Sequence, residues 1–208
     1  MIMRKILYFL LIAFLPAAAM AQTKNEQQII QTINKASAGL KSIECDFVQT
    51  KHLKMLNDKM VANGKMYYKQ PDKLHWEYTS PYKYTFILND NKVVLKKNGR
   101  NDVIDINQNK MFREIARLIM NTVMGKSLGD GKTFKASVKE TPSEWTVTLV
   151  PQKKEMKQMW TTIILTFSRS QQMISKVRMC EKNGDYTLIE MKNVKQNKPV
   201  SDAHFNVR

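Results

Sequence analysis

Alternating apolar and polar residues predict a β-hairpin in the first half of the chain. Leu74, Trp76 and Tyr78 fall on one side of its second strand, and the positions between them are polar or charged. This period of two is the pattern of a half-buried strand. Pro71 lacks the N–H group needed for a ladder hydrogen bond, so it belongs in the turn between the strands. The pattern therefore predicts a hairpin over residues 61–78.

Shorter stretches of the same pattern follow along most of the chain. Turn signals such as Asn-Asp-Asn at 89–91 and Asn-Gly at 98–99 separate them. Strands are expected over 43–51, 84–88, 93–97 and near 102–106, and again from 135 onward with alternation at 145–149. A lysine-rich turn is expected to begin at Pro151. Further strands are expected over 163–167, 177–179 and 186–191, with a last extended segment at Phe205. Close spacing of short strands indicates an antiparallel sheet that curls.

Two segments have helical spacing instead. Ile29, Ile33 and Leu40 recur on one face of residues 25–40, which predicts an amphipathic helix. The second segment, 110–124, is more strongly apolar and rich in methionine. It is either an ordinary core helix capping the sheet or a lid over an apolar cavity, since methionine side chains adapt to irregular ligands. The fold class expected is mainly β with α (α+β).

The first 21 residues have the order of a secretory signal peptide. Arg4 and Lys5 precede an apolar run over 6–15, and Ala19-Met20-Ala21 supplies the small residues for cleavage after Ala21. The alternative is a retained N-terminal anchor, although the apolar run is short for a membrane span. Residue 22 is glutamine, so the cysteine that would carry a lipoprotein's lipid is absent. Residues 22–208 are expected to form a single domain, soluble and monomeric.

The chain is strongly basic. Its formal charge is +16, and removing Arg4 and Lys5 with the signal peptide leaves about +14 (16 − 2). Such an excess attracts anionic partners, among them nucleic acid, lipid headgroups and acidic proteins. The lysines are spread over the whole sequence, which is equally typical of a solvated basic surface, and export argues against nucleic acid.

No motif gives a persuasive catalytic, metal or cofactor site. Gly125 to Gly129 matches the G-x-S-x-G nucleophile motif around Ser127, but it follows a helix instead of a strand. A phosphate-binding loop ending in the same Gly-Lys-Ser would need glycine at position 120, where the chain has methionine. The three histidines are isolated, and single acids have no evident catalytic partner. Whether Cys45 and Cys180 form a disulfide stays open.

The remaining functional hypothesis is the binding of apolar groups. A curled sheet with a methionine-rich helix could leave a dry cavity that takes up apolar groups, driven by their removal from water. A filled core would use the same residues.

An ordered set of short motifs resembles the periplasmic outer-membrane lipoprotein carriers, the LolA family. The set comprises Phe47-x-Gln49, Gly64, Pro71-x-x-Leu74-His75-Trp76, Pro81 and the tail Asn193…Asn197-x-Pro199…Phe205. The match covers about 26–205. One departure concerns the residue before the tryptophan, which is arginine in the family pattern and His75 here. The resemblance ties that arginine to the lid, so it implies that His75 stands at the lid-latch position with the family's arginine replaced.

The resemblance implies an unclosed antiparallel barrel with a helical lid over an apolar cavity. Such a protein would be a periplasmic chaperone, taking acyl chains of lipoproteins from an inner-membrane ABC transporter towards an outer-membrane acceptor. The sheet side of the cavity is expected to comprise Phe47, Leu74, Trp76, Tyr78, Phe86 and Leu88. The lid side is expected to comprise Phe112, Ile115, Ile119 and Val123.

Three alternatives remain. The same fold could carry another lipid or a glycolipid. The protein could instead be a sensor or adaptor that binds a protein partner through its basic surface. A hydrolase built on Ser127 is the third.

Overall fold

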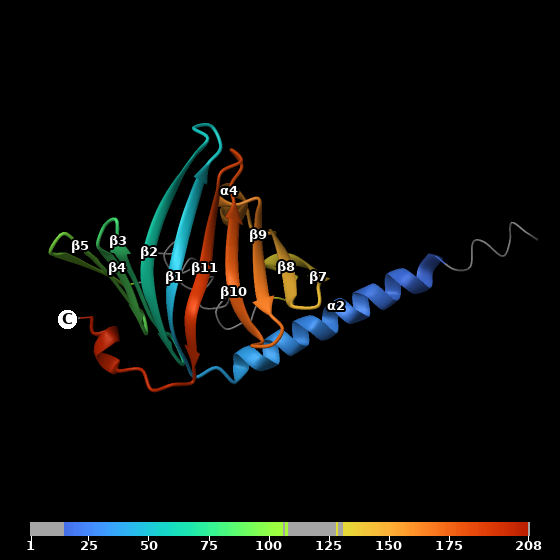
Figure 1. Ribbon diagram of the computed structural model, residues 1–208, viewed down its shortest axis with the longest axis horizontal. Helices are drawn as coiled ribbons and strands as arrows, with labels where there is room; N and C mark the ends of the chain where they lie inside the picture. Colours follow the sequence, from blue (N-terminus) through green and yellow to red (C-terminus); the bar gives the residue numbers. More distant parts are fainter. Residues whose placement is uncertain (1–14, 106, 108–127, 129–130, 208) are drawn as a thin grey trace, which may run out of the picture.

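The computed structural model describes residues 15–105, 107, 128 and 131–207, and its main feature is one large β-sheet (Figure 1). Its strands are β1 Ser42–Leu53, β2 Asp58–Lys69, β3 Lys73–Ser80, β4 Tyr84–Asn89, β5 Lys92–Lys97, β6 Arg100–Asp105, β7 Phe134–Glu140, β8 Glu144–Pro151, β9 Thr162–Ser168, β10 Met173–Cys180 and β11 Tyr186–Gln196. The predicted hairpin is present as β2 and β3, with residues 70–72 between them.

The eleven strands are in the order β6-β5-β4-β3-β2-β1-β11-β10-β9-β8-β7. Strands from β1 to β6 pair in sequence order, as do those from β7 to β11. The long-range pairing of β1 with β11 joins the two runs, for example through Phe47 opposite Met191. The end strands β6 and β7 do not pair, and the sheet curls without closing (Figure 1). The predicted unclosed antiparallel sheet is confirmed.

Three helical elements accompany the sheet in the described part of the chain: α2 Leu15–Ala38, α4 Lys154–Met159 and the 3-10 helix η1 Asp202–Phe205. The first predicted helix ends close to its expected place, because Gly39 follows α2. It begins earlier than expected, at Leu15, in a stretch of alanines that favour helix. Cleavage after Ala21 therefore remains a prediction. None of the described helices is both long and apolar enough to cross a membrane.

The core lies on one face of the sheet, which we call the inner face. Alternate positions on each strand point to it, as the period of a strand requires. Ile29 and Ile33 of α2 join this core, where α2 packs against β7 and β10. Met156 of α4 joins it beside β8.

Two sequence expectations about local structure are wrong. The segment at Phe205 is not extended but forms η1, whose first turn is capped by the Ser201 side chain accepting from the Ala203 N–H. The lysine-rich stretch after Pro151 is more than a turn, since it contains α4. The four expected lid residues Phe112, Ile115, Ile119 and Val123 lie outside the described residues.

Candidate functional site

The inner face of β2 to β5 is built from three rows of side chains that run across the strands. The first row is buried and consists of Tyr68, Leu74, Leu88 and Val93. The second consists of Met66, Trp76, Phe86 and Leu95, of which only Met66 is fully buried. The third consists of Gly64, Tyr78, Tyr84 and Lys97. Exposure therefore rises from the first row to the third, so this part of the sheet has a buried floor and a more open rim.

An aromatic cluster lies where these rows meet β1. The rings of Phe47 and Trp76 are stacked with centroids 4.1 Å apart, and Tyr78 meets Phe47 edge-on at 5.3 Å. Both geometries are favourable for aromatic pairs. Phe47 is 1% exposed, whereas Trp76 and Tyr78 are half-buried. The cluster thus combines a fixed aromatic base with partly accessible apolar surface.

The tyrosines at the rim of this surface are polar but uncharged. The Tyr78 hydroxyl donates to Gln49 Oε1 at 2.8 Å. Burial raises the pKa of Tyr78, and burial and then the charge of Asp102 raise the pKa of Tyr84. Both phenols therefore stay neutral well above physiological pH and give the apolar surface a hydrogen-bonding border.

The helices α2 and α4 cover the other half of the inner face. The principal sheet contacts of α2 are with β7 and β10, and those of α4 are with β8. Trp76, Phe86, Leu95 and Ile104 are half-buried against the core on the opposite half. Among the residues that the structure describes, this is an apolar, aromatic surface suited to hold hydrocarbon.

All six residues expected on the sheet side of the cavity lie on the inner face. Phe47, Leu74 and Leu88 are buried in the core, and Trp76, Tyr78 and Phe86 pack against it. The structure brings them together, while their part in binding remains a prediction.

His75 points to the opposite, outer face. Its Nδ1 lies 2.6 Å from the carbonyl oxygen of His204, which can only accept, so Nδ1 carries the hydrogen. Its Nε2 is buried without a hydrogen-bond partner, 3.6 Å from the Glu77 carboxylate. The ring thus contacts the C-terminal segment. Lid latching by His75 stays a prediction, and these described contacts do not support it.

Cys45 and Cys180 are both free thiols. Cys45 is buried on β1, where its Sγ lies 3.7 Å from Met191 Sδ. Cys180 ends β10, opposite Tyr186 of β11. Because Tyr186 pairs on its other side with His52, seven positions beyond Cys45 on β1, the two thiols lie far apart along the sheet.

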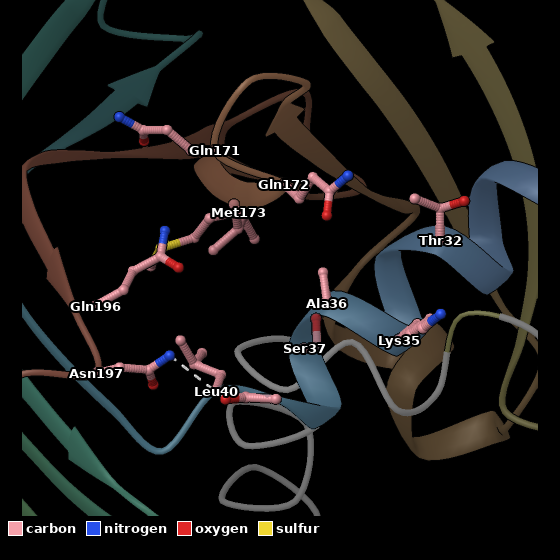
Figure 2. A pocket seen from close by; sticks show the side chains of 12 residues that line it. Thr32, Lys35, Ala36, Ser37, Leu40, Gln171, Gln172, Met173, Gln196 and Asn197 are labelled. Atoms are coloured by element: carbon pink, nitrogen blue, oxygen red, sulfur yellow. Dashed lines mark hydrogen bonds between the residues drawn. The ribbon is translucent and has the colours of Figure 1, made fainter.

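A hollow of about 620 Å³, separate from this apolar surface, lies between the end of α2, the β9–β10 turn and the end of β11 (Figure 2). Leu40 and Met173 form apolar parts of its wall, and Lys35 supplies a cation. Its polar lining comes mainly from hydroxyl and amide side chains: Thr32, Ser37, Gln171, Gln172, Gln196 and Asn197. Asn197 is already engaged, since its Oδ1 accepts from the Lys41 N–H at 2.7 Å. This lining suits a polar ligand better than a hydrocarbon chain.

Sequence reasoning missed several members of the apolar surface. Leu95 and Ile104 extend it to β5 and β6, and Tyr84 and Gln49 form part of its rim. The alternation of Val93 and Leu95 could have identified Leu95, but the apolar Val94 between them hides the period. No group of three or more metal-ligating side chains occurs within the described ranges. Ser127 lies outside them.

The sequence matches the family model described as "Outer membrane lipoprotein carrier protein LolA" over residues 38–208. The chain belongs to this family. The match begins at the end of α2 and takes in every strand of the sheet. Among curated protein sequences, none matches the chain.

Solved structures with a similar fold have very different sequences. The MucA/MucB complex from Pseudomonas aeruginosa matches with a TM-score of 0.54 and 6% identity, over 88% of this chain and 60% of that chain. An uncharacterized conserved protein from Thermus thermophilus matches with a TM-score of 0.54 and 8% identity, over 86% and 91%. A DUF1329 family protein from Desulfovibrio piger matches with a TM-score of 0.50 and 11% identity, over 89% and 97%. These likenesses support the fold.

Proposed function

We propose that this protein is a periplasmic carrier that binds the acyl chains of lipoproteins and moves them from the inner towards the outer membrane. The observation that carries the proposal is the half-buried apolar surface around Trp76, Phe86 and Leu95 on the inner face. Family membership adds support, because the family is described as one of outer membrane lipoprotein carriers. An inner-membrane ABC transporter would supply the cargo, and an outer-membrane acceptor would receive it.

The physical basis of binding would be the removal of hydrocarbon from water. Each methylene group buried contributes about 0.8 kcal/mol, so an acyl chain laid along this surface gains several kcal/mol without any polar contact. The buried first row would form the floor for the chain, and the tyrosine rim would face its polar end. Residues 112–123 would supply the lid. We propose no catalytic step, and Ser127→Ala should leave carrier activity unchanged.

The test is uptake of a fluorescent fatty acid by delipidated protein. Trp76→Ala should lower its affinity at least about tenfold, because it removes a large part of the accessible aromatic surface. Ile115→Glu should weaken uptake as well, because it places a charge on the expected lid. Tyr186→Ala is the matched aromatic control, since Tyr186 pairs with His52 on the outer face, and it should bind normally. No measurable uptake by the delipidated wild type would rule the carrier function out.

The identity of the cargo needs a separate measurement. Mass spectrometry of lipids extracted from protein purified out of its own periplasm should show acylated lipoprotein. Recovery of a glycolipid or another free lipid would keep the fold's carrier role but change its cargo.

A second candidate function is binding to a protein partner. It rests on the structural likeness to MucB, which is recorded in complex with MucA, and on the basic composition of this chain. Binding to a periplasmic protein that weakens with salt, together with an absence of bound lipid, would favour this candidate. Lipid binding that persists in the same preparation would favour the carrier.

A further inference from the structure

The β1–β2 hairpin ends in an exposed apolar tip, which we define as residues 54–61. Met55 is 90% exposed, Leu56 71% and Met60 59%. Figure 1 shows this hairpin projecting at one end of the sheet, beside the turn between β10 and β11. Leaving such side chains in water has a cost, so the tip is a candidate contact surface.

The turn itself directs the two most exposed side chains outward. The Asn57 N–H donates to the Lys54 carbonyl at 3.3 Å, and Asn57 has a φ of 47°, which asparagine tolerates better than most residues. Met55 and Leu56 are therefore the central residues of the turn, beyond the last strand pair formed by Leu53 and Asp58. Neither has a neighbouring strand to pack against.

The neighbouring turn braces the tip. The Lys54 N–H donates to Asp185 Oδ1 at 2.9 Å, and the Lys51 ammonium pairs with Glu181. Behind these contacts, the ring of Tyr186 stacks on His52 with centroids 4.1 Å apart, and the Arg178 guanidinium lies 3.8 Å from the Tyr186 ring centroid. A braced tip loses little conformational freedom when it binds.

Cations outnumber acids around the tip, with Lys51, Lys54, Lys59 and Lys182 against Asp58, Glu181 and Asp185. Lys54 and Lys59 flank the turn and Lys182 lies on the adjoining turn, and none of the three forms an ion pair with another described residue. The two nearby aspartates keep their negative charges but are held by hydrogen bonds to backbone N–H groups. Asp58 accepts from the Lys59 N–H, and Asp185 accepts from the Lys54 N–H.

We propose that this tip inserts Met55 and Leu56 into the surface of an anionic lipid bilayer, with the lysines contacting lipid phosphates. Apolar side chains next to unpaired lysines fit the boundary between acyl chains and charged headgroups. The alternative occupant is a protein, but a stable protein interface buries roughly 800 Å² per partner. The tip offers only four exposed large apolar side chains, Met55, Leu56, Met60 and Val61. The proposal does not depend on the acyl-chain surface, which lies on the inner face around Trp76.

Flotation of the full chain with vesicles tests the proposal. The wild type should bind phosphatidylcholine vesicles that contain phosphatidylglycerol, and bind pure phosphatidylcholine vesicles much less. The double substitution M55S/L56S should lower the partition coefficient at least about tenfold, because it removes both apolar side chains. V103S is the matched control and should bind normally, because Val103 is 58% exposed on β6, away from the tip.

A second pair of variants tests the contribution of the lysine charges to vesicle binding. K54Q/K59Q should weaken binding to the anionic vesicles several-fold, and high salt should remove the difference from wild type. K135Q/K139Q is the control of equal charge change on β7 and should have a smaller effect. Thermal melting of each variant shows whether it is folded.

Insertion can be observed directly with L56C carrying an environment-sensitive fluorophore in a C180S background. Its emission should rise and shift to the blue on anionic vesicles. No vesicle binding by the wild type, or equal binding by M55S/L56S, would overturn the proposal. If M55S/L56S also lost binding to a protein partner while its vesicle binding stayed equal, the tip would be assigned to that partner. Fatty-acid uptake by the same M55S/L56S protein separates failure of this proposal from failure of the carrier function.

Discussion

At the scale of single residues, the absence of a side chain at Gly64 shapes the aromatic cluster. A Cβ atom at this position would overlap the Phe47 ring and the Glu77 carbonyl oxygen. Only glycine lets the Phe47 ring lie across β2 and stack on Trp76. This close approach explains a glycine in the interior of a strand, where it otherwise weakens the sheet.

The two cysteines differ in their surroundings, and their reactivity should differ accordingly. Burial, with the charges of Asp46 and Glu44, raises the pKa of Cys45 to about 12. Because the thiolate is the reactive form, Cys45 should resist iodoacetamide at pH 8 in the folded protein, whereas the half-exposed Cys180 should react. Mass spectrometry of the digested protein measures the modification at each site, and denaturant should make both react. Equal labelling in the native state would contradict the buried environment of Cys45.

Asp72 predicts a pH dependence of stability. Burial, and then its neighbour Asp90, raise the pKa of Asp72 in the folded state. The folded state therefore favours the protonated carboxyl, so its stabilising contribution is present in acid and is lost as pH rises through the folded pKa. Asp72→Asn should raise the free energy of unfolding at pH 7 by less than about 1 kcal/mol, since the residue is only half-buried and solvent screens its charge, and the gain should vanish near pH 3.

Urea unfolding at the two pH values measures this difference. Glu140→Gln, on an exposed position of β7, is the control and should show no such gain. A variant that is less stable than wild type at pH 7 would mean that the charged carboxylate is stabilising.

At the scale of elements, the C-terminal segment covers part of the outer face of the sheet, where η1 packs against β3 and β4. Phe205 is 1% exposed, and its carbonyl accepts from Asn89 Nδ2 at 3.0 Å. The His204 ring stacks on Tyr67 at 3.8 Å. Ile87 and Val94 are buried on this face although they lie outside the main core. The segment therefore forms a second, smaller packed layer behind the inner face.

Phe205→Ala should destabilise the protein by about 3–5 kcal/mol, the usual range for removing a buried phenylalanine. Urea unfolding measures the loss, and Val103→Ala, an exposed position on β6, should change stability by no more than about 0.5 kcal/mol. A small effect of Phe205→Ala would show that the segment rests on the sheet without stabilising it.

At the scale of the whole molecule, the two halves of the curled sheet differ in what covers their inner face. Near β7 to β10 its inner face is filled by α2 and α4. Near β3 to β6 it keeps a half-buried apolar surface with a buried floor. The hairpin tip projects from one end of β1 and β2, on a different part of the molecule. A carrier needs both a surface that shelters hydrocarbon and a means to approach membranes, and the proposals place these in separate elements.

Much of the fold could be predicted because strand alternation is local. The spacing of Leu74, Trp76 and Tyr78 places them on one face whatever the rest of the chain does. The same alternation places Phe86 and Leu88 on one face, and turn residues such as Asn98-Gly99 mark the ends of the strands. The prediction of an extended segment at Phe205 is wrong. The Ser201 cap and the packing against β3 and β4 fix η1, and the local sequence pattern does not reveal that packing.

By itself, the sequence determined the order of the strands along the chain, the family resemblance and which residues share a face. Only the tertiary structure decided which face is the inner one, since alternation is symmetric until a second layer packs on one side. It also decided the pairing of β1 with β11, the separation of Cys45 from Cys180 and the contact of His75 with the C-terminal segment. Each of these concerns residues more than a hundred positions apart in the chain, and no local pattern specifies whether such residues meet.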